Sequence, residues 1–182
     1  MSVRPINDIA GHHEFNEVFF SDYFVPDDKM LGNEGDGWAI VTSELSFERS
    51  GPDRFLSDYR LLVELIDRIG KSPSEFQAVE IGRLIGHLSA LLRMSTSITS
   101  LLDQGISPSV EAALLKNMGT SFEREVPEIA RRLLPIEASF DDAYDPLSEA
   151  QADVLLRAPS FTLRGGTREI LRGVVARGLG LR

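Results

Sequence analysis

Two short polar segments of this sequence have residue types that could do chemistry. In the first, Glu48 follows the apolar residues Leu45 and Phe47 and precedes Arg49. A carboxylate among apolar neighbours can have a raised pKa and can act as a general base. The residues alone leave open the alternative of a surface glutamate beside an arginine.

The second segment spans residues 164–169 and reads Arg-Gly-Gly-Thr-Arg-Glu. Two glycines before the start of a helix let backbone N–H groups approach an anion or a carbonyl closely, with the helix dipole behind them. The alternative is an ordinary loop in which Thr167 is the helix N-cap.

Other polar groups favour structural interpretations. His12 and His13 are adjacent in a turn, where neighbouring side chains on extended backbone point to opposite faces and chelate poorly. The charged runs 123–125 and 131–132 are typical of the solvated face of an amphipathic helix. We therefore expect no metal site.

Composition narrows the class of protein. The 182 residues suggest one domain, or one domain with a short appendage, and 42% hydrophobic residues suffice for a sizeable core. A net charge of −9 makes nucleic acid an unlikely ligand, and the absence of cysteine excludes disulfides, Cys-ligated metals and thiol catalysis. No stretch is long and apolar enough to span a membrane, so we expect a soluble, cytoplasmic protein.

The first 30 residues differ from the rest. Aromatic and β-branched residues crowd into 15–25 and stop at Pro26, a pattern that predicts a strand. Because both faces of this strand are apolar, it either docks on the helices that follow or has lost its neighbours, and we favour lost neighbours. Residues 1–30 are therefore interpreted as the remnant of a β domain.

The remaining chain, 31–182, is predicted to be helical. Apolar residues recur at helical spacing in several runs, namely 38–66 (kinked or split by Pro52), 76–102, 108–133 (with Ser107 as N-cap), 147–158 and 167–175. An acidic loop is expected at 135–147. Long amphipathic helices joined by short turns bury their stripes economically in an antiparallel bundle. The predicted fold class is all-α, an up-and-down helical bundle with a short N-terminal β segment.

Taken together, the two ends of the chain resemble the C-terminal half of an acyl-CoA dehydrogenase. The motifs that carry the resemblance are Val-Arg-Pro-Ile at 3–6, Phe-Asn-Glu-Val-Phe-Phe at 15–20, Leu31-Gly32, Gly-Asp-Gly-Trp at 35–38, and the closing segment 161–182. The middle of the chain is matched only as helices. The resemblance implies the end of that family's middle β domain followed by its C-terminal bundle.

Enzymes of this family use FAD to convert an acyl-CoA to the trans-2-enoyl-CoA and pass electrons to an electron-transferring flavoprotein. Many members carry the catalytic glutamate where this chain has Gly165, so the usual base is absent. Other branches place it in a Glu-Arg pair on the first bundle helix, which Glu48 matches. The resemblance thus implies Glu48 as base, with the Gly165 backbone N–H donating to the thioester carbonyl.

Three further residues acquire roles from the resemblance. Arg49 matches a position near the acyl-CoA channel, and Thr167 and Glu169 match positions that contact the flavin or its adenosine part. Relatives assemble as homodimers or homotetramers.

Departures from the family pattern suggest an alternative. The family's Arg-Phe-Gly motif, which reaches FAD across a dimer interface, is missing around 71–76, and its Gly-Gly-x-Gly turn is replaced by 136–146. The family's N-terminal helical domain and most of its β domain do not occur in these residues, so we expect a fragment or half-gene product. The alternative function is a non-catalytic oligomerisation or partner subunit of a heteromeric acyl-CoA dehydrogenase.

Overall fold

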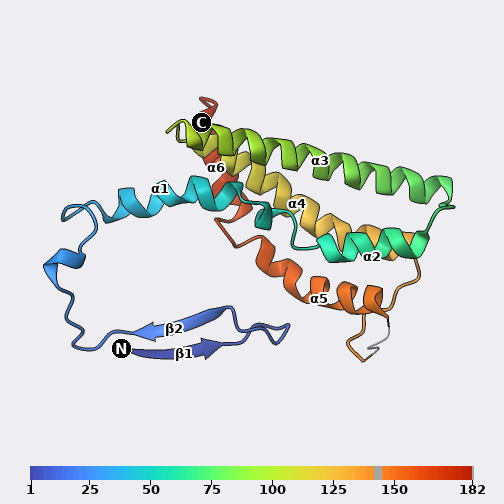
Figure 1. Ribbon diagram of the computed structural model, residues 1–182, viewed down its shortest axis with the longest axis horizontal. Helices are drawn as coiled ribbons and strands as arrows, with labels where there is room; N and C mark the ends of the chain where they lie inside the picture. Colours follow the sequence, from blue (N-terminus) through green and yellow to red (C-terminus); the bar gives the residue numbers. More distant parts are fainter. Residues whose placement is uncertain (142–144, 182) are drawn as a thin grey trace. The chain divides into compact units, whose positions relative to one another are not determined.

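The computed structural model describes residues 1–141 and 145–181 (Figure 1). Residues 142–144 of the predicted acidic loop, and Arg182 of the closing segment, lie outside the described residues. The chain divides into two compact units, Met1–Glu44 and Leu45–Arg182, which are described separately.

The first unit begins with a β-hairpin. Strands β1 (Ser2–Ile6) and β2 (Phe15–Phe19) pair antiparallel, with Ser2 opposite Phe19 and Ile6 opposite Phe15. The prediction of a lone strand over 15–25 was therefore wrong in two respects. The strand ends at Phe19, and Ser2–Ile6, a segment too short and too polar to register as a strand, supplies a neighbour.

The turn between the strands contains the histidine pair. The Asp8 carboxylate accepts hydrogen bonds from the N–H groups of Ala10 and His12, at 2.9 and 2.8 Å, and so forms the turn. His13 lies 2.9 Å from the Asn16 side chain through Nε2. All residues of both strands are exposed, although an isolated two-stranded hairpin is at best marginally stable in water.

The 3₁₀ turn η1 (Asp27–Lys29) follows the hairpin, and helix α1 (Gly37–Ser50) comes next along the chain. The boundary between the two units falls within α1, after Glu44.

In the second unit, Gly51 and Pro52 split the first long run rather than kink it. The short turn η2 (Pro52–Arg54) separates α1 from α2 (Tyr59–Ile69). Helix α3 (Glu75–Asp103) begins with a capping box, in which the Ser74 side chain accepts from the Gln77 N–H and the Gln77 side chain bonds the Ser74 N–H.

Helix α4 (Ser109–Leu133) begins one residue later than predicted. Pro108 occupies the N-cap position and no side chain caps the helix, so the expectation of Ser107 as N-cap was wrong. Helices α5 (Pro146–Phe161) and α6 (Arg168–Gly178) complete the unit.

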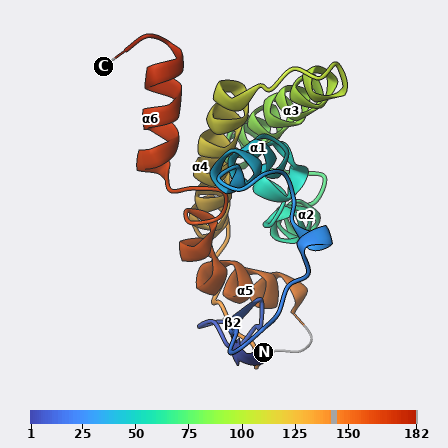
Figure 2. The same ribbon diagram turned by 90° about the vertical axis from the view of Figure 1, so that its left-hand side faces the viewer.

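Helix α4 lies at the centre of this bundle. It packs against α2, α3, α5 and α6, and the views in Figures 1 and 2 both place it between them. The core joins the apolar stripes of these helices through residues such as Phe55, Leu65, Leu91, Phe122 and Phe161, all at most 2% exposed. The predicted all-α bundle with a short N-terminal β segment is confirmed.

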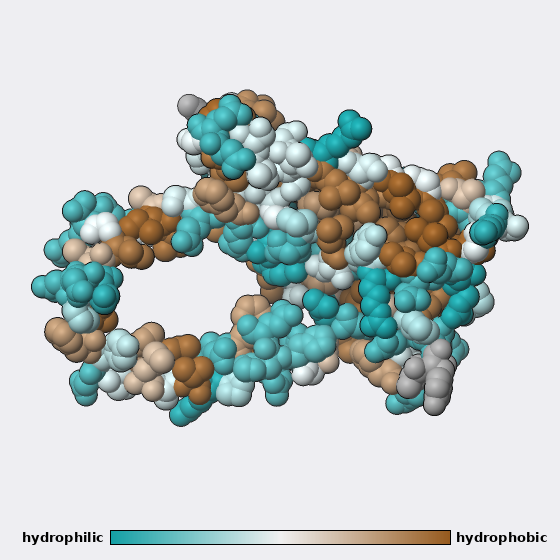
Figure 3. All heavy atoms as spheres, in the orientation of Figure 1, coloured by the Kyte–Doolittle hydropathy of each residue, from teal (hydrophilic) through white to brown (hydrophobic). Residues whose placement is uncertain are grey.

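Apolar side chains also reach the surface of the helical unit. Figure 3 shows apolar atoms gathered on the face over α2 and α3. Among the exposed residues of these two helices are Val63, Phe76, Val79, Ile85 and Leu92. No helix of the described residues is long and apolar enough to cross a membrane.

Candidate functional site

Glu48 lies near the C-terminal end of α1 and faces the turn that follows. Its Oε1 atom is 3.1 Å from Nη2 of Arg54, and Nε of Arg54 donates to the Glu48 carbonyl oxygen at 2.8 Å. The Glu48 side chain is 39% exposed and that of Arg54 is 12% exposed. Arg54 therefore fixes both the backbone and the carboxylate of Glu48 while leaving the carboxylate accessible.

The loop between α5 and α6 passes directly beside this carboxylate. Gly165 and Gly166 have φ angles of +66° and +110°, which L-residues rarely adopt. A Cβ atom built on Gly165 would lie 3.4 Å from Oε1 of Glu48. A longer side chain at 165 would compete with the carboxylate for space, and the structure brings these two candidate residues together.

Arg49 contacts the backbone of the same loop. Its side chain is 8% exposed, and Nε donates to the Gly165 carbonyl oxygen at 2.7 Å. Burial lowers the pKa of Arg49, and the neighbouring Glu48 opposes that shift. The structure thus places Arg49 against the loop backbone, where it fixes the orientation of the Gly165 peptide.

Thr167 and Glu169 lie where α6 begins. Thr167 is the N-cap, as the simpler interpretation predicted, but its side chain makes no capping hydrogen bond. The pKa of Glu169 is lowered by hydrogen bonds from its own backbone and from Thr167, and by the charges of Arg172 and Arg168.

The sequence analysis did not identify a set of buried charged residues that lies next to this loop. Glu123 is fully buried, so the interpretation of 123–125 as a solvated run was wrong for this residue. Nη2 of Arg164 donates to both Glu123 oxygens at 3.1 Å, and the Ser57 N–H donates to Oε1 at 3.3 Å. Burial raises the pKa of Glu123, while Ser57 and Arg164 counteract that shift.

Lys116 is the second member of this buried set. Its Nζ donates to the Phe161 carbonyl oxygen at 2.7 Å and to the Thr120 hydroxyl, and burial lowers its pKa to about 8. Its Cε lies 3.8 Å from the position that a Gly165 Cβ would take. Lys116 therefore supports the loop at the end of α5.

Asp58 is the third member, and it is 1% exposed. Neither of its carboxylate oxygens has a hydrogen-bond partner among the described residues. Burial, and secondly the charge of Glu123, raise its pKa to about 8. Burial among these groups therefore favours the protonated form of Asp58.

One signal in the sequence could have revealed Lys116 and Glu123. Both fall at core spacing on α4 with the buried residues Ala112, Val126 and Ala130. Because charged residues are seldom fully buried, this spacing was not taken to indicate burial of Lys116 or Glu123.

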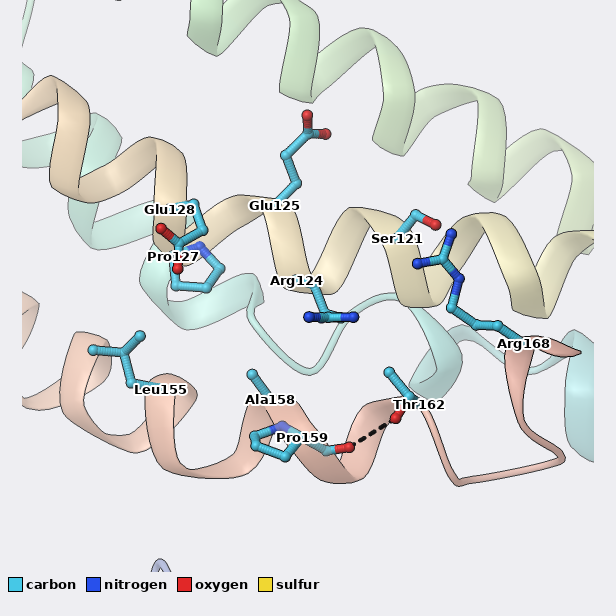
Figure 4. Close-up of a pocket in the computed structure, with 10 residues that line it drawn as sticks. All are labelled: Ser121, Arg124, Glu125, Pro127, Glu128, Leu155, Ala158, Pro159, Thr162 and Arg168. Atoms are coloured by element: carbon cyan, nitrogen blue, oxygen red, sulfur yellow. Dashed lines mark hydrogen bonds between the residues drawn. The ribbon is translucent and has the colours of Figure 1, made fainter.

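A wide groove of about 900 Å³ lies elsewhere, between α4 and α5 (Figure 4). Its walls include Arg124, Leu155, Pro159, Thr162 and Arg168. Neither Glu48 nor Gly165 lines it, so the groove is separate from the site formed by the α1 carboxylate and the glycine loop.

The fold is a helical bundle of the type found in the C-terminal domains of acyl-CoA dehydrogenases. No family model matches the chain. The chain is 30% identical over its full length to the acyl-CoA dehydrogenase IpdE1 of Mycolicibacterium smegmatis, of which it covers 46%. It is 27% identical over 97% of its length to the acyl-CoA dehydrogenase FadE34 of Mycobacterium tuberculosis, of which it covers 24%.

Solved structures show the same fold. A steroid acyl-CoA dehydrogenase, Tcur3481-Tcur3483, superposes with a TM-score of 0.83 at 22% identity, over all of this chain and 49% of the other. The ChsE4-ChsE5 complex from Mycobacterium tuberculosis gives 0.73 at 21% identity, over all of this chain and 50% of the other. The resemblance to the acyl-CoA dehydrogenase family is confirmed, and the chain spans half or less of the length of these relatives.

Proposed function

We propose that this chain is the C-terminal part of a flavin-dependent acyl-CoA dehydrogenase, with Glu48 as the base that removes the α-proton of the acyl-CoA thioester. The observation that carries the proposal is the 3.4 Å separation between Oε1 of Glu48 and the Cβ position of Gly165. It supports a carboxylate supplied from α1 in place of one on the loop.

The other residues of the site position these groups. The Gly165 N–H donates to the thioester oxygen and so acidifies the α-carbon, because donors aimed at developing negative charge stabilise the enolate. Arg49 holds the Gly165 carbonyl and Arg54 holds Glu48, so neither group has to reorganise during proton transfer. We further propose that the aliphatic part of Arg49 lies beside the acyl chain.

The start of α6 offers groups that fit a flavin. Thr167 is partly exposed and Glu169 is exposed, and a hydroxyl and a carboxylate are suitable partners for the hydroxyls of FAD. Bound FAD would supply the acceptor for the β-hydrogen. An electron-transferring flavoprotein is the partner that we infer, and residues 1–30 are proposed as the remnant of the middle β domain preceding the bundle at 31–182.

The test of the base is Glu48→Gln in the complete enzyme. We expect the visible flavin spectrum to be unchanged and the rate of flavin bleaching by acyl-CoA to fall by at least about 100-fold, since a positioned general base contributes that much or more. Glu44→Gln, one turn earlier on α1, is the matched control and retains the rate. Full activity of Glu48→Gln would refute the assignment.

A second candidate function is supported by two of the structural neighbours. Both Tcur3481-Tcur3483 and ChsE4-ChsE5 are named for two different chains. We propose as the alternative that this chain is the partner subunit of a heteromeric acyl-CoA dehydrogenase and has no complete site alone. Light scattering and flavin absorption on the chain, alone and with a complete dehydrogenase subunit, separate the two: the alternative requires a stable complex and no turnover loss in Glu48→Gln.

A further inference from the structure

The loop between α5 and α6 contains two consecutive glycines and few hydrogen bonds of its own. Gly165 and Gly166 both have positive φ angles, and glycine reaches many backbone conformations because it lacks a Cβ atom. Within the loop, the Leu163 N–H donates to the Ser160 carbonyl oxygen at 2.9 Å, and the Gly166 N–H donates to the Leu163 carbonyl oxygen at 3.3 Å. A fixed orientation of the Gly165 backbone therefore requires contacts from outside the loop.

The N–H of Gly165 differs from that of Gly166 in having no acceptor. Within residues 1–141 and 145–181, it donates to neither a backbone nor a side-chain oxygen. Under the function proposed above, this N–H donates to the thioester oxygen, and such a donor is most effective when it is oriented before the reaction. Its orientation is that of the peptide between Arg164 and Gly165.

The Arg164 side chain anchors one end of this peptide in the protein interior. Its Nη2 donates to both Glu123 carboxylate oxygens at 3.1 Å and to the Ser57 hydroxyl at 3.0 Å. Its guanidinium carbon lies 4.6 Å from the centroid of the Phe161 ring. The Glu123 side chain is 0% exposed, and it also accepts from the Ser57 N–H at 3.3 Å. The residue before Gly165 is thus held by α4, by the segment before α2 and by the end of α5.

Arg49 anchors the backbone on the other side of Gly165. Its Nε donates to the Gly165 carbonyl oxygen at 2.7 Å. Contacts on both sides of one glycine restrict its two peptide planes, although the residue has no side chain to pack. A buried ion pair is weak evidence for stability, because apolar residues of similar volume often stabilise a core at least as well. A role in fixing one loop conformation explains the pair of Arg164 and Glu123 better.

We propose that Arg164 and Glu123 are positioning residues for the thioester. Their buried pair holds the peptide between Arg164 and Gly165 in one orientation, so that its N–H is ready to donate to the thioester oxygen. This inference rests on the function proposed above and adds the groups that keep the thioester donor rigid. Both residues act through the backbone of Gly165 rather than on the acyl group itself.

Nuclear magnetic relaxation of the full chain measures the rigidity of the Gly165 N–H directly. We expect an order parameter of about 0.85 in the parent chain, as in rigid backbone, and below about 0.6 when Arg164→Met is combined with Glu123→Leu. This double variant removes both charges and keeps apolar volume in the core, so it is expected to fold. Gly105, whose φ angle is also positive, is the reference residue whose order parameter stays unchanged.

Leu84→Ala is the matched control for loss of stability alone. Leu84 is fully buried on α3, and its truncation weakens the core without changing either anchor of the loop. We expect its melting temperature to fall while the Gly165 order parameter stays at the parent value. A rigid Gly165 N–H in the double variant, a mobile one in the parent, or an equal loss of order in Leu84→Ala would overturn the proposal.

Kinetics of the complete enzyme then connect this rigidity to the reaction. We expect the double variant to lower the rate of flavin bleaching at saturating acyl-CoA by about tenfold or more, with a smaller change in KM, because the donor acts mainly on the transition state. A mobile Gly165 N–H with an unchanged rate would refute the positioning role. The order parameter requires neither flavin nor Glu48, so full activity of Glu48→Gln would refute the base without altering this measurement.

Discussion

At the scale of single residues, the buried charges beneath the glycine loop determine how well the site is held. Glu123 has both oxygens bonded by Arg164 and is fully buried, whereas Glu128 on the same helix pairs with Arg131 at the surface. Removing one partner of a buried pair leaves an uncompensated charge, but removing one partner of an exposed pair costs little.

We therefore expect Glu123→Ala to lower the free energy of unfolding by about 3–5 kcal/mol. Glu128→Ala is the control and should change it by at most about 1 kcal/mol. Urea denaturation followed by circular dichroism measures both. Equal effects of the two substitutions would contradict the buried pairing of Glu123 with Arg164.

The raised pKa of Asp58 predicts how the free energy of unfolding depends on pH. Its folded pKa of about 8 exceeds the ordinary value of 3.8, so the folded state holds a proton that the unfolded state releases between these values. Stability is thus present in full at acidic pH and falls as the pH rises through this window, by up to about 1.4 kcal/mol per pH unit from this group. Other titratable groups also contribute to the dependence of stability on pH. The contribution of Asp58 is therefore measured as the difference in stability between the parent and an Asp58 variant.

Asp58→Asn removes this titration. We expect the variant to gain stability relative to the parent at pH 8 and to gain less at pH 5, measured as the difference in melting temperature at the two pH values. A constant difference across the range would show that Asp58 is ionised in the folded protein.

At the scale of the helices, one close approach fixes α4 against the turn after α1. A Cβ atom on Gly119 would lie 2.6 Å from the Arg54 carbonyl oxygen, whereas one on Gly82 of α3 would meet nothing within 4 Å. The missing side chain at 119 is therefore what lets α4 approach the turn that carries Arg54, the partner of Glu48.

We expect Gly119→Ala to destabilise the bundle by about 1–3 kcal/mol, because the backbone has to move. Gly82→Ala is expected to stabilise it by about 0.5–1 kcal/mol through helix propensity alone. Thermal unfolding of the two variants gives the comparison. A stabilising Gly119→Ala would show that the two segments are not in close contact.

Helix positions followed from the sequence because apolar spacing, prolines and glycines are local signals. Gly51 and Pro52 mark the split in the first run, and Pro73 and Gly105 bracket α3. The pairing of β1 with β2 could not be predicted, since Ser2–Ile6 has too few apolar residues to display a period. The predicted N-terminus of α4 was one residue too early. Proline is favoured at the first helical position, but Pro108 occupies the N-cap position here.

The candidate site was only partly predictable for a related reason. Gly165 was identified within the closing segment 161–182, and Glu48 through the Glu-Arg pair that the resemblance places on the first bundle helix. Asp58 belongs to no motif and precedes the first turn of α2, so its burial depends on tertiary packing. Lys116 falls at core spacing on α4, but lysine is seldom fully buried, and the spacing alone did not indicate its burial.

At the scale of the whole molecule, much apolar surface is uncovered. Strands β1 and β2 are exposed throughout, and Phe76, Val79 and Leu92 on α3 are each more than 40% exposed. Exposed apolar surfaces of this kind mark interaction sites in soluble proteins. Assembly into a homodimer or homotetramer, as in relatives, or into the proposed heteromeric complex is expected to cover part of this surface.

Visible absorption of the purified chain at known concentration, with and without added FAD, is the decisive measurement at this scale. About one flavin per chain or per dimer would show that the cofactor binds without further domains, and assays of acyl-CoA oxidation would follow. A colourless chain that gains flavin only with a partner subunit supports the heteromeric alternative. Light scattering on the same sample gives the mass of the assembly.

The hydrogen bond from Arg49 to Gly165 has a consequence for how the site forms. It joins residues separated by 116 positions in the chain. Because closing so long a loop costs entropy before the contact can compensate, we expect the local helix pairs to form before this contact does. During synthesis, residues up to Gly165 must leave the ribosome before Glu48 and Gly165 can meet, so a translation product truncated before Gly165 has no assembled site.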